Sequence, residues 1–140
     1  MSIEISREEF EKITEEAIAD IPKKFLSKLE NVEIVIENYP SQYQIDKVFG
    51  SRKEREFYEK NKFSILGLYE GIPQTKRYHY GGVVPDKITI FKKPIERKSS
   101  SLQDLREIIR NTVWHEIAHH FGMSEEEVRK AETQRRKRKH

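Results

Sequence analysis

The chain has 140 residues, which is enough for one domain, residues 1–140, with a single modest hydrophobic core. Charged residues make up 36% of it and hydrophobic residues 35%, but seven Phe and six Tyr exclude a disordered chain. The sequence contains no cysteine. Disulfides are therefore excluded, and a bound metal ion would need histidine and carboxylate ligands.

The formal net charge of +3 comes from the C-terminal tail. Five Lys and Arg residues fill positions 135–139, so the rest of the chain carries a formal charge of −2. A terminal basic run is typical of a solvated end, so residues 134–140 are interpreted as a basic tail, and nucleic acid is not an expected partner. The N-terminus lacks the features of a signal peptide, and no apolar run approaches the roughly 18 residues of a membrane span. These features predict a cytoplasmic protein with no membrane partner.

Hydrophobic periodicity predicts two helices and a strand at the start of the chain. Ser6 followed by Glu9 is a capping-box pattern, and apolar residues then recur at helical spacing over 7–20. A short helical turn is predicted at 23–29, after a proline. Apolar residues at 32, 34 and 36 alternate with residues 33, 35 and 37, two of which are glutamates, and this pattern is typical of a half-buried strand.

The middle of the chain is less regular, and residues 38–62 are interpreted as an irregular or inserted segment. A loop is predicted over 38–44, and the charged stretch 51–62 is interpreted as either an exposed helix or a mobile insertion. Two further strands are predicted at 65–69 and at 87–93, the second ended by the proline that follows it.

A long helix is predicted over 102–121, with serines at 99–101 available as its N-cap. Its apolar residues fall on one side at about 100° per residue, so that side is expected to pack on the sheet. Gly122 is expected to end this helix. Ser124 and Glu127 form a second capping-box pattern that opens a last helix.

The residues that carry chemistry lie at the end of the long helix. The sequence HEIAHHFGMSE, residues 115–125, contains the motif HExxH and, in extended form, HExxHxxGxxE. His115 and His119 are one helical turn apart on the same face, so their imidazoles can converge on one zinc ion. Glu116 is placed to act as general base toward a water at that ion. The alternative is a solvated helix that carries two incidental histidines.

The third ligand is predicted to follow a sharp turn. Gly122 can adopt a left-handed conformation cheaply, and the resulting bend would bring Glu125 back toward the histidines. Three protein ligands and an open position are the arrangement of a catalytic zinc site. Glu126, Glu127 and Glu132 are alternatives for this position, although Glu127 is better explained as the capping-box partner.

Other candidates have simpler explanations. His120 falls on the apolar side of the helix, which favours a packed or supporting histidine over a metal ligand. Trp114 and Met123 are expected in the core. The aromatic and histidine residues at 78–80 are interpreted either as oxyanion-stabilising groups or as loop packing.

Several blocks in order make the chain resemble the family of small bacterial zincin-like metallopeptidases. SILGLYEGIP is similar to an LGLYEG block, GGVVPDKITIFKKPI to a block with a PD pair, and HEIAHHFGMSEE to the HExxHHFG hallmark with its following acidic residue. The resemblance implies an α+β minimal zincin-like domain, in which a small mixed sheet packs against an N-terminal helix and the HExxH helix. It implies His115 and His119 as ligands and Glu116 as base, with Glu125 where the family usually has Asp.

The expected function is a zinc-dependent metallopeptidase that hydrolyses peptide bonds, with a peptide or protein substrate lying along 87–93 as an edge strand. One alternative is a metal-binding regulatory or interaction protein of the same fold without efficient catalysis. A second alternative is a nucleic-acid-associated protein that acts through residues 129–140.

Overall fold

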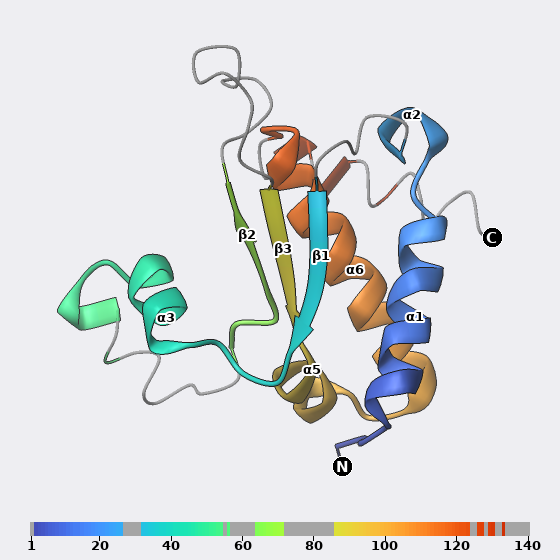
Figure 1. The fold of residues 1–140 in the computed structure, drawn as a ribbon, viewed down its shortest axis with the longest axis horizontal. Coiled ribbons are helices and arrows are strands. Elements are labelled where there is room, and N and C mark those ends of the chain that lie inside the picture. Colours follow the sequence, from blue (N-terminus) through green and yellow to red (C-terminus); the bar gives the residue numbers. More distant parts are fainter. Residues whose placement is uncertain are drawn as a thin grey trace.

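The computed structural model describes residues 2–26, 32–54, 56, 64–71, 86–123, 126, 127, 129, 130 and 133. Within these residues the chain forms an α+β domain, in which helices flank a three-stranded mixed sheet (Figure 1). No helix in this part of the chain combines the length and apolar character needed to cross a bilayer. The expected α+β class, with a small mixed sheet beside helices, is confirmed.

The first helix, α1, spans Arg7–Ala19 and confirms the prediction over 7–20. Its N-cap is Ser6, whose hydroxyl accepts a hydrogen bond from the backbone N–H of Glu9 at 3.1 Å. The buried side of the helix includes Phe10 and Ile13. A second short helix, α2, follows at Lys23–Leu26.

The sheet contains the three predicted strands, β1 (Val32–Glu37), β2 (Gly67–Glu70) and β3 (Asp86–Phe91). Their order is β1-β3-β2, with β3 parallel to β1 and antiparallel to β2. The interpretation of 87–93 as an edge strand is therefore wrong. β3 is the central strand, and five of its six residues are buried. Ile88 and Ile90 on one face of β3 and Thr89 and Phe91 on the other are all fully buried, which fits a strand paired on both sides.

The first helix missed by the sequence analysis is α3, Gln42–Val48, which begins inside the loop expected over 38–44. A reciprocal capping box starts it. The Ser41 hydroxyl accepts from the backbone N–H of Gln44 at 3.2 Å, and the Gln44 side-chain oxygen accepts from the backbone N–H of Ser41 at 2.8 Å. Farther along, residues 52–54 and 56 are helical and exposed.

The second missed helix, α5, spans Lys92–Lys98 and begins where the third strand was expected to continue. Pro94 lies in its first turn, where a proline removes no intrahelical hydrogen bond. The ammonium of Lys92 lies 2.9 Å from a carboxylate oxygen of Glu96, and both side chains are buried. The same oxygen of Glu96 accepts from the backbone N–H of Ile5 at 2.8 Å. The carboxylate of this buried ion pair thus attaches the N-terminal residues to α5.

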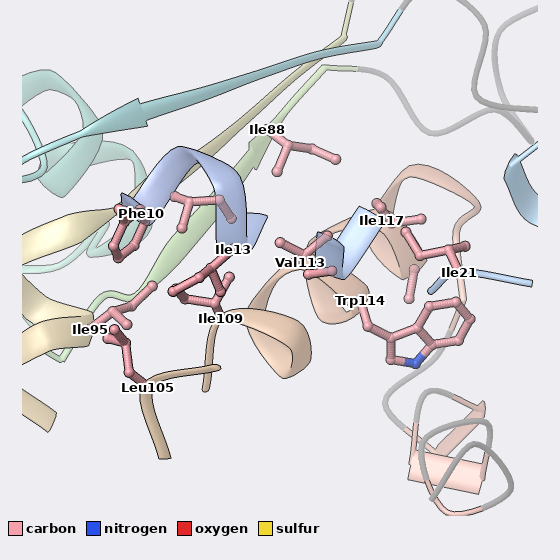
Figure 2. Packing of buried hydrophobic residues seen from close by; sticks show 13 residues of the cluster. Phe10, Ile13, Ile21, Ile88, Ile95, Leu105, Ile109, Val113, Trp114 and Ile117 are labelled. Atoms are coloured by element: carbon pink, nitrogen blue, oxygen red, sulfur yellow. The ribbon is translucent and has the colours of Figure 1, made fainter. Parts of the chain in front are cut away.

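The long helix α6, Leu102–His120, follows the N-cap Ser101 and confirms the prediction over 102–121. Its apolar side packs with α1 and with β3 to form one core (Figure 2). Trp114 is 4% exposed and belongs to this core, as expected. The fully enclosed members of the core come from four elements: Phe10, Ile88, Ile90, Ile95, Leu105, Ile109, Val113, Ile117 and Ala118.

Two arginines that interrupt the apolar side of α6 have partners on α1. Arg106 lies 3.2 Å from Glu16, and Arg110 lies 2.9 Å from Asp20 at the C-cap of α1. Both guanidinium groups therefore lie at the border of the helix pair, where they form ion pairs across it. Their position at the border explains how two charged residues can occur on a helix side that is otherwise apolar.

Candidate metal and catalytic site

The last three turns of α6 form one wall of an open pocket with a volume of about 490 Å³. The opposite walls come from β2 with the residues before it, and from the end of α3. The lining residues are Val48, Phe49, Ser64, Ile65, Leu66, Gly67, Leu68, Tyr69, Asn111, Thr112, His115, Glu116 and His119. The HExxH histidines and glutamate therefore share one cavity.

The two histidines lie side by side on the pocket face of α6. The ring centroids of His115 and His119 are 4.8 Å apart, with 55° between the ring planes. Both residues are partly exposed, so a ligand in the pocket can reach them. This is the placement expected for residues four apart in a helix. Two imidazoles on adjacent turns suit a divalent ion that prefers nitrogen ligands, such as zinc.

The glutamate of the motif is more enclosed than the histidines. Glu116 is 7% exposed, and one of its carboxylate oxygens lies 3.7 Å from Nδ1 of His119. Its side chain lies against Gly67 of β2, and the residue lines the same pocket. A carboxylate held beside the imidazoles, rather than away from them, suits a group that receives a proton at the metal site.

A glycine in β2 allows this close approach. A Cβ atom on Gly67 would lie 2.7 Å from the Thr112 methyl carbon Cγ2 and 3.2 Å from Cγ of Glu116. It would also lie 3.3 Å from the carbonyl oxygen of Thr89. The absence of a side chain at Gly67 therefore sets how closely α6 packs against β2 at the position of Glu116.

We expect Gly67→Ala to destabilise the fold by about 1–3 kcal/mol, because the added methyl group has no room. Adding Thr112→Ser removes the closest atom, and the serine hydroxyl can still donate to the carbonyl of Ile108, as the threonine does at 2.7 Å. Part of the lost stability should then return, measured as the free energy of unfolding in urea. An unchanged free energy of unfolding in Gly67→Ala would show that β2 and α6 can move apart without cost, and that their close packing does not require a glycine.

The helix ends at the residue that the sequence predicted. Gly122 has a φ of 68°, in the left-handed region. Its backbone N–H donates to the carbonyl of His119 at 3.0 Å, and that of Met123 donates to the carbonyl of Ala118 at 3.1 Å. These two bonds form a Schellman motif, and Met123 packs against the core. The chain therefore turns directly after the histidines.

Replacing this glycine tests the turn. Gly122→Ala should lower the free energy of unfolding by about 1–2 kcal/mol, because an alanine in the left-handed region is strained. Gly122→Asn is the matched variant, since asparagine tolerates that region and should cost less. Urea denaturation of both proteins measures the difference. Equal losses in both variants would argue that side-chain crowding, not backbone strain, determines the effect.

The predicted third ligand, Glu125, lies outside the described residues, as do Glu132 and residues 78–80. Glu126 and Glu127 are exposed, and the Glu126 carboxylate lies 3.7 Å from the ammonium of Lys130. Within the described part of the chain, no three His, Cys, Asp or Glu side chains form a metal-binding group. The donors that are described, a pair of imidazoles beside a carboxylate at a pocket, are of the types that zinc uses.

Behind the motif lies a polar cluster that the sequence analysis did not find. His120 is 1% exposed, which confirms the expectation of a packed histidine. Its ring contacts Asp86 at the start of β3, and Asp86 also accepts a hydrogen bond from Tyr69 of β2. These contacts join residues 17 and 34 positions apart, and no spacing rule in the sequence connects them.

Comparison with known protein families gives a match that covers most of the chain. A family model described as zincin-like metallopeptidase matches residues 29–135, which cover all three strands and α6. The chain belongs to the zincin-like metallopeptidase family. A search of curated proteins found no match. Membership of the zincin-like family confirms the resemblance seen in the sequence.

Proposed function

We propose that this zincin-like chain is a zinc-dependent peptidase that hydrolyses peptide bonds in peptide or protein substrates. The observation that supports the proposal most directly is the shared pocket wall of His115, Glu116 and His119. In the proposal, His115, His119 and Glu125 hold the metal, and Glu116 is the general base. The family membership supports a metallopeptidase-like site in this fold.

Each residue has a distinct task in this scheme. Zinc, when bound, polarises the scissile carbonyl and lowers the pKa of a coordinated water toward about 7. Glu116 accepts the proton of the attacking water at its carboxylate and then transfers it to the leaving amine nitrogen as the C–N bond breaks. Its burial against β2 keeps the carboxylate in one place and so reduces the reorganisation needed for proton transfer.

The substrate is proposed to lie along β2, not β3. Among the described strands β2 lies at an edge of the sheet, and residues from Leu66 to Tyr69 line the pocket beside the histidines. An extended peptide can add to such an edge through backbone hydrogen bonds. This replaces the substrate position expected from the sequence, because the central strand β3 has no free edge.

Metal analysis followed by peptide-library profiling tests the proposal. Protein purified without chelators should contain about one zinc ion per chain, and the zinc-loaded protein should cleave members of the library. A chelator should stop cleavage, and added zinc should restore it. Zinc uptake without cleavage would support the alternative of a metal-binding regulatory or interaction protein. Failure to bind any divalent ion would refute both.

A further inference from the structure

The polar cluster behind the motif connects α6 and β2, which both line the pocket, with the central strand β3. Nδ1 of His120, at the end of α6, lies 2.5 Å from Oδ2 of Asp86, and both side chains are 1% exposed. The hydroxyl of Tyr69 donates to the same oxygen at 2.9 Å. The Tyr69 and His120 rings are 6.0 Å apart in an edge-to-face arrangement. One carboxylate therefore receives donors from both α6 and β2.

The residues around the Asp86 carboxylate leave it little room to move. Gly71, directly after β2, approaches so closely that a Cβ atom there would overlap the Asp86 carboxylate. Asp86 itself is fixed in the central strand, next to Val32 of β1. The end of β2, the start of β3 and the last turn of α6 thus meet at one side chain. Such a junction defines the position of the helix end relative to the sheet.

We propose that Asp86, His120 and Tyr69 are positioning residues that set the rotation of α6 about its axis, and so aim His115, Glu116 and His119 into the pocket. His120 follows His119 directly and points about 100° away from it around the helix. Fixing the direction of one side chain therefore fixes the direction of the other. Tyr69 extends the effect to the pocket itself, because it lines the cavity while its hydroxyl is held by Asp86.

Stability alone does not account for this cluster. Burying a carboxylate carries a desolvation penalty, and well-packed apolar residues of similar size are often as stable as a buried polar pair or more stable. A polar cluster instead accepts few alternative geometries, because a misplaced donor leaves the carboxylate unsatisfied. The cluster therefore gives the end of α6 a single defined orientation. The directions of the two proposed histidine ligands and of the proposed base depend on that orientation.

The experiment compares variants that remove the cluster in different ways. His120→Leu removes one donor, and His120→Asn restores a donor near the position of Nδ1. The triple variant Tyr69→Phe/Asp86→Leu/His120→Phe removes all the polar groups together, so it leaves no unpaired carboxylate and should fold even if His120→Leu does not. Each protein is measured for zinc affinity by chelator competition, for unfolding in urea, and, without metal, for amide hydrogen exchange.

The expected result separates orientation from stability. The triple variant should keep most of its free energy of unfolding, yet bind zinc about 10–100-fold more weakly, as when outer partners of metal ligands are lost. Its amides near 115–121 should exchange faster in the metal-free protein, while those of α1 stay unchanged. His120→Asn should bind zinc more tightly than His120→Leu or, if that variant does not fold, than the triple variant.

The opposite result would overturn the inference. If the triple variant binds zinc like the wild type and its helix end exchanges no faster, the cluster does not position the site. The zinc measurement rests on the proposed function, but the exchange measurement does not. If the wild type takes up no zinc, the proposed function fails, and local exchange in the metal-free proteins alone decides the inference. Zinc binding without peptide cleavage would leave the inference intact.

Discussion

Glu116→Gln is expected to lower kcat/KM for peptide cleavage by about 10²–10⁴-fold, the range for loss of a general base. Glutamine has nearly the same size and fits the space beside Gly67, but its amide cannot accept the proton of the attacking water. Zinc content and the free energy of unfolding should stay close to those of the wild type. Cleavage assays on the best library peptide, with metal analysis of the same samples, measure both effects.

Glu107→Gln is the matched control for this variant. Glu107 is on the same helix, but its carboxylate lies 3.5 Å from Arg110 and does not line the pocket. Its replacement should leave the cleavage rate unchanged. Undiminished cleavage by Glu116→Gln would reject the assigned base, and an equal loss in both variants would indicate a general effect of charge on α6.

His115→Ala should remove the bound zinc and, with it, peptide hydrolysis. Each imidazole is one of only three proposed protein ligands, so its loss should weaken zinc binding by more than the roughly 10–100-fold effect of losing an outer hydrogen-bond partner. The residue is partly exposed on the pocket wall, so the fold should tolerate the change. Chelator competition gives the affinity, and elemental analysis gives the metal content.

Asn111→Ala provides the comparison, because Asn111 lines the same pocket one turn earlier and is not a proposed ligand. It should bind zinc as the wild type does. Glu125→Ala extends the series to the proposed third ligand and should also weaken zinc binding. If His115→Ala and His119→Ala both keep the wild-type zinc content, the metal is bound somewhere other than at the HExxH motif.

Sequence periodicity was sufficient for the elements whose buried residues repeat regularly. α1 and α6 each have a serine N-cap and an apolar side, and their predicted bounds agree with the structure to within about a residue. The three strands were also found. α5 was missed because Pro94 was interpreted as the end of a strand, although proline is also common in the first turn of a helix.

The order of the strands could not be obtained in the same way. The alternating isoleucines of β3 predict a strand, but strand order depends on pairing between distant residues such as Ile34 and Ile88. The same limit applies to the site. Spacing within one helix placed His115 and His119 side by side, whereas the contact of His120 with Asp86 requires the folded sheet. The role of Gly67 was missed for the same reason.

The position of β3 also bears on how the chain folds during synthesis. In the described sheet, β1 and β2 each pair only with β3, which is the last of the three strands to be synthesised. A nascent chain that stops before residue 86 therefore holds two strands without their common partner. Contacts between α1 and α6 likewise join segments from opposite ends of the sequence. Such distant pairings slow folding. Until β3 and α6 have emerged from the ribosome, β1 and β2 are without their native partners, and unpaired strands of this kind are prone to aggregation.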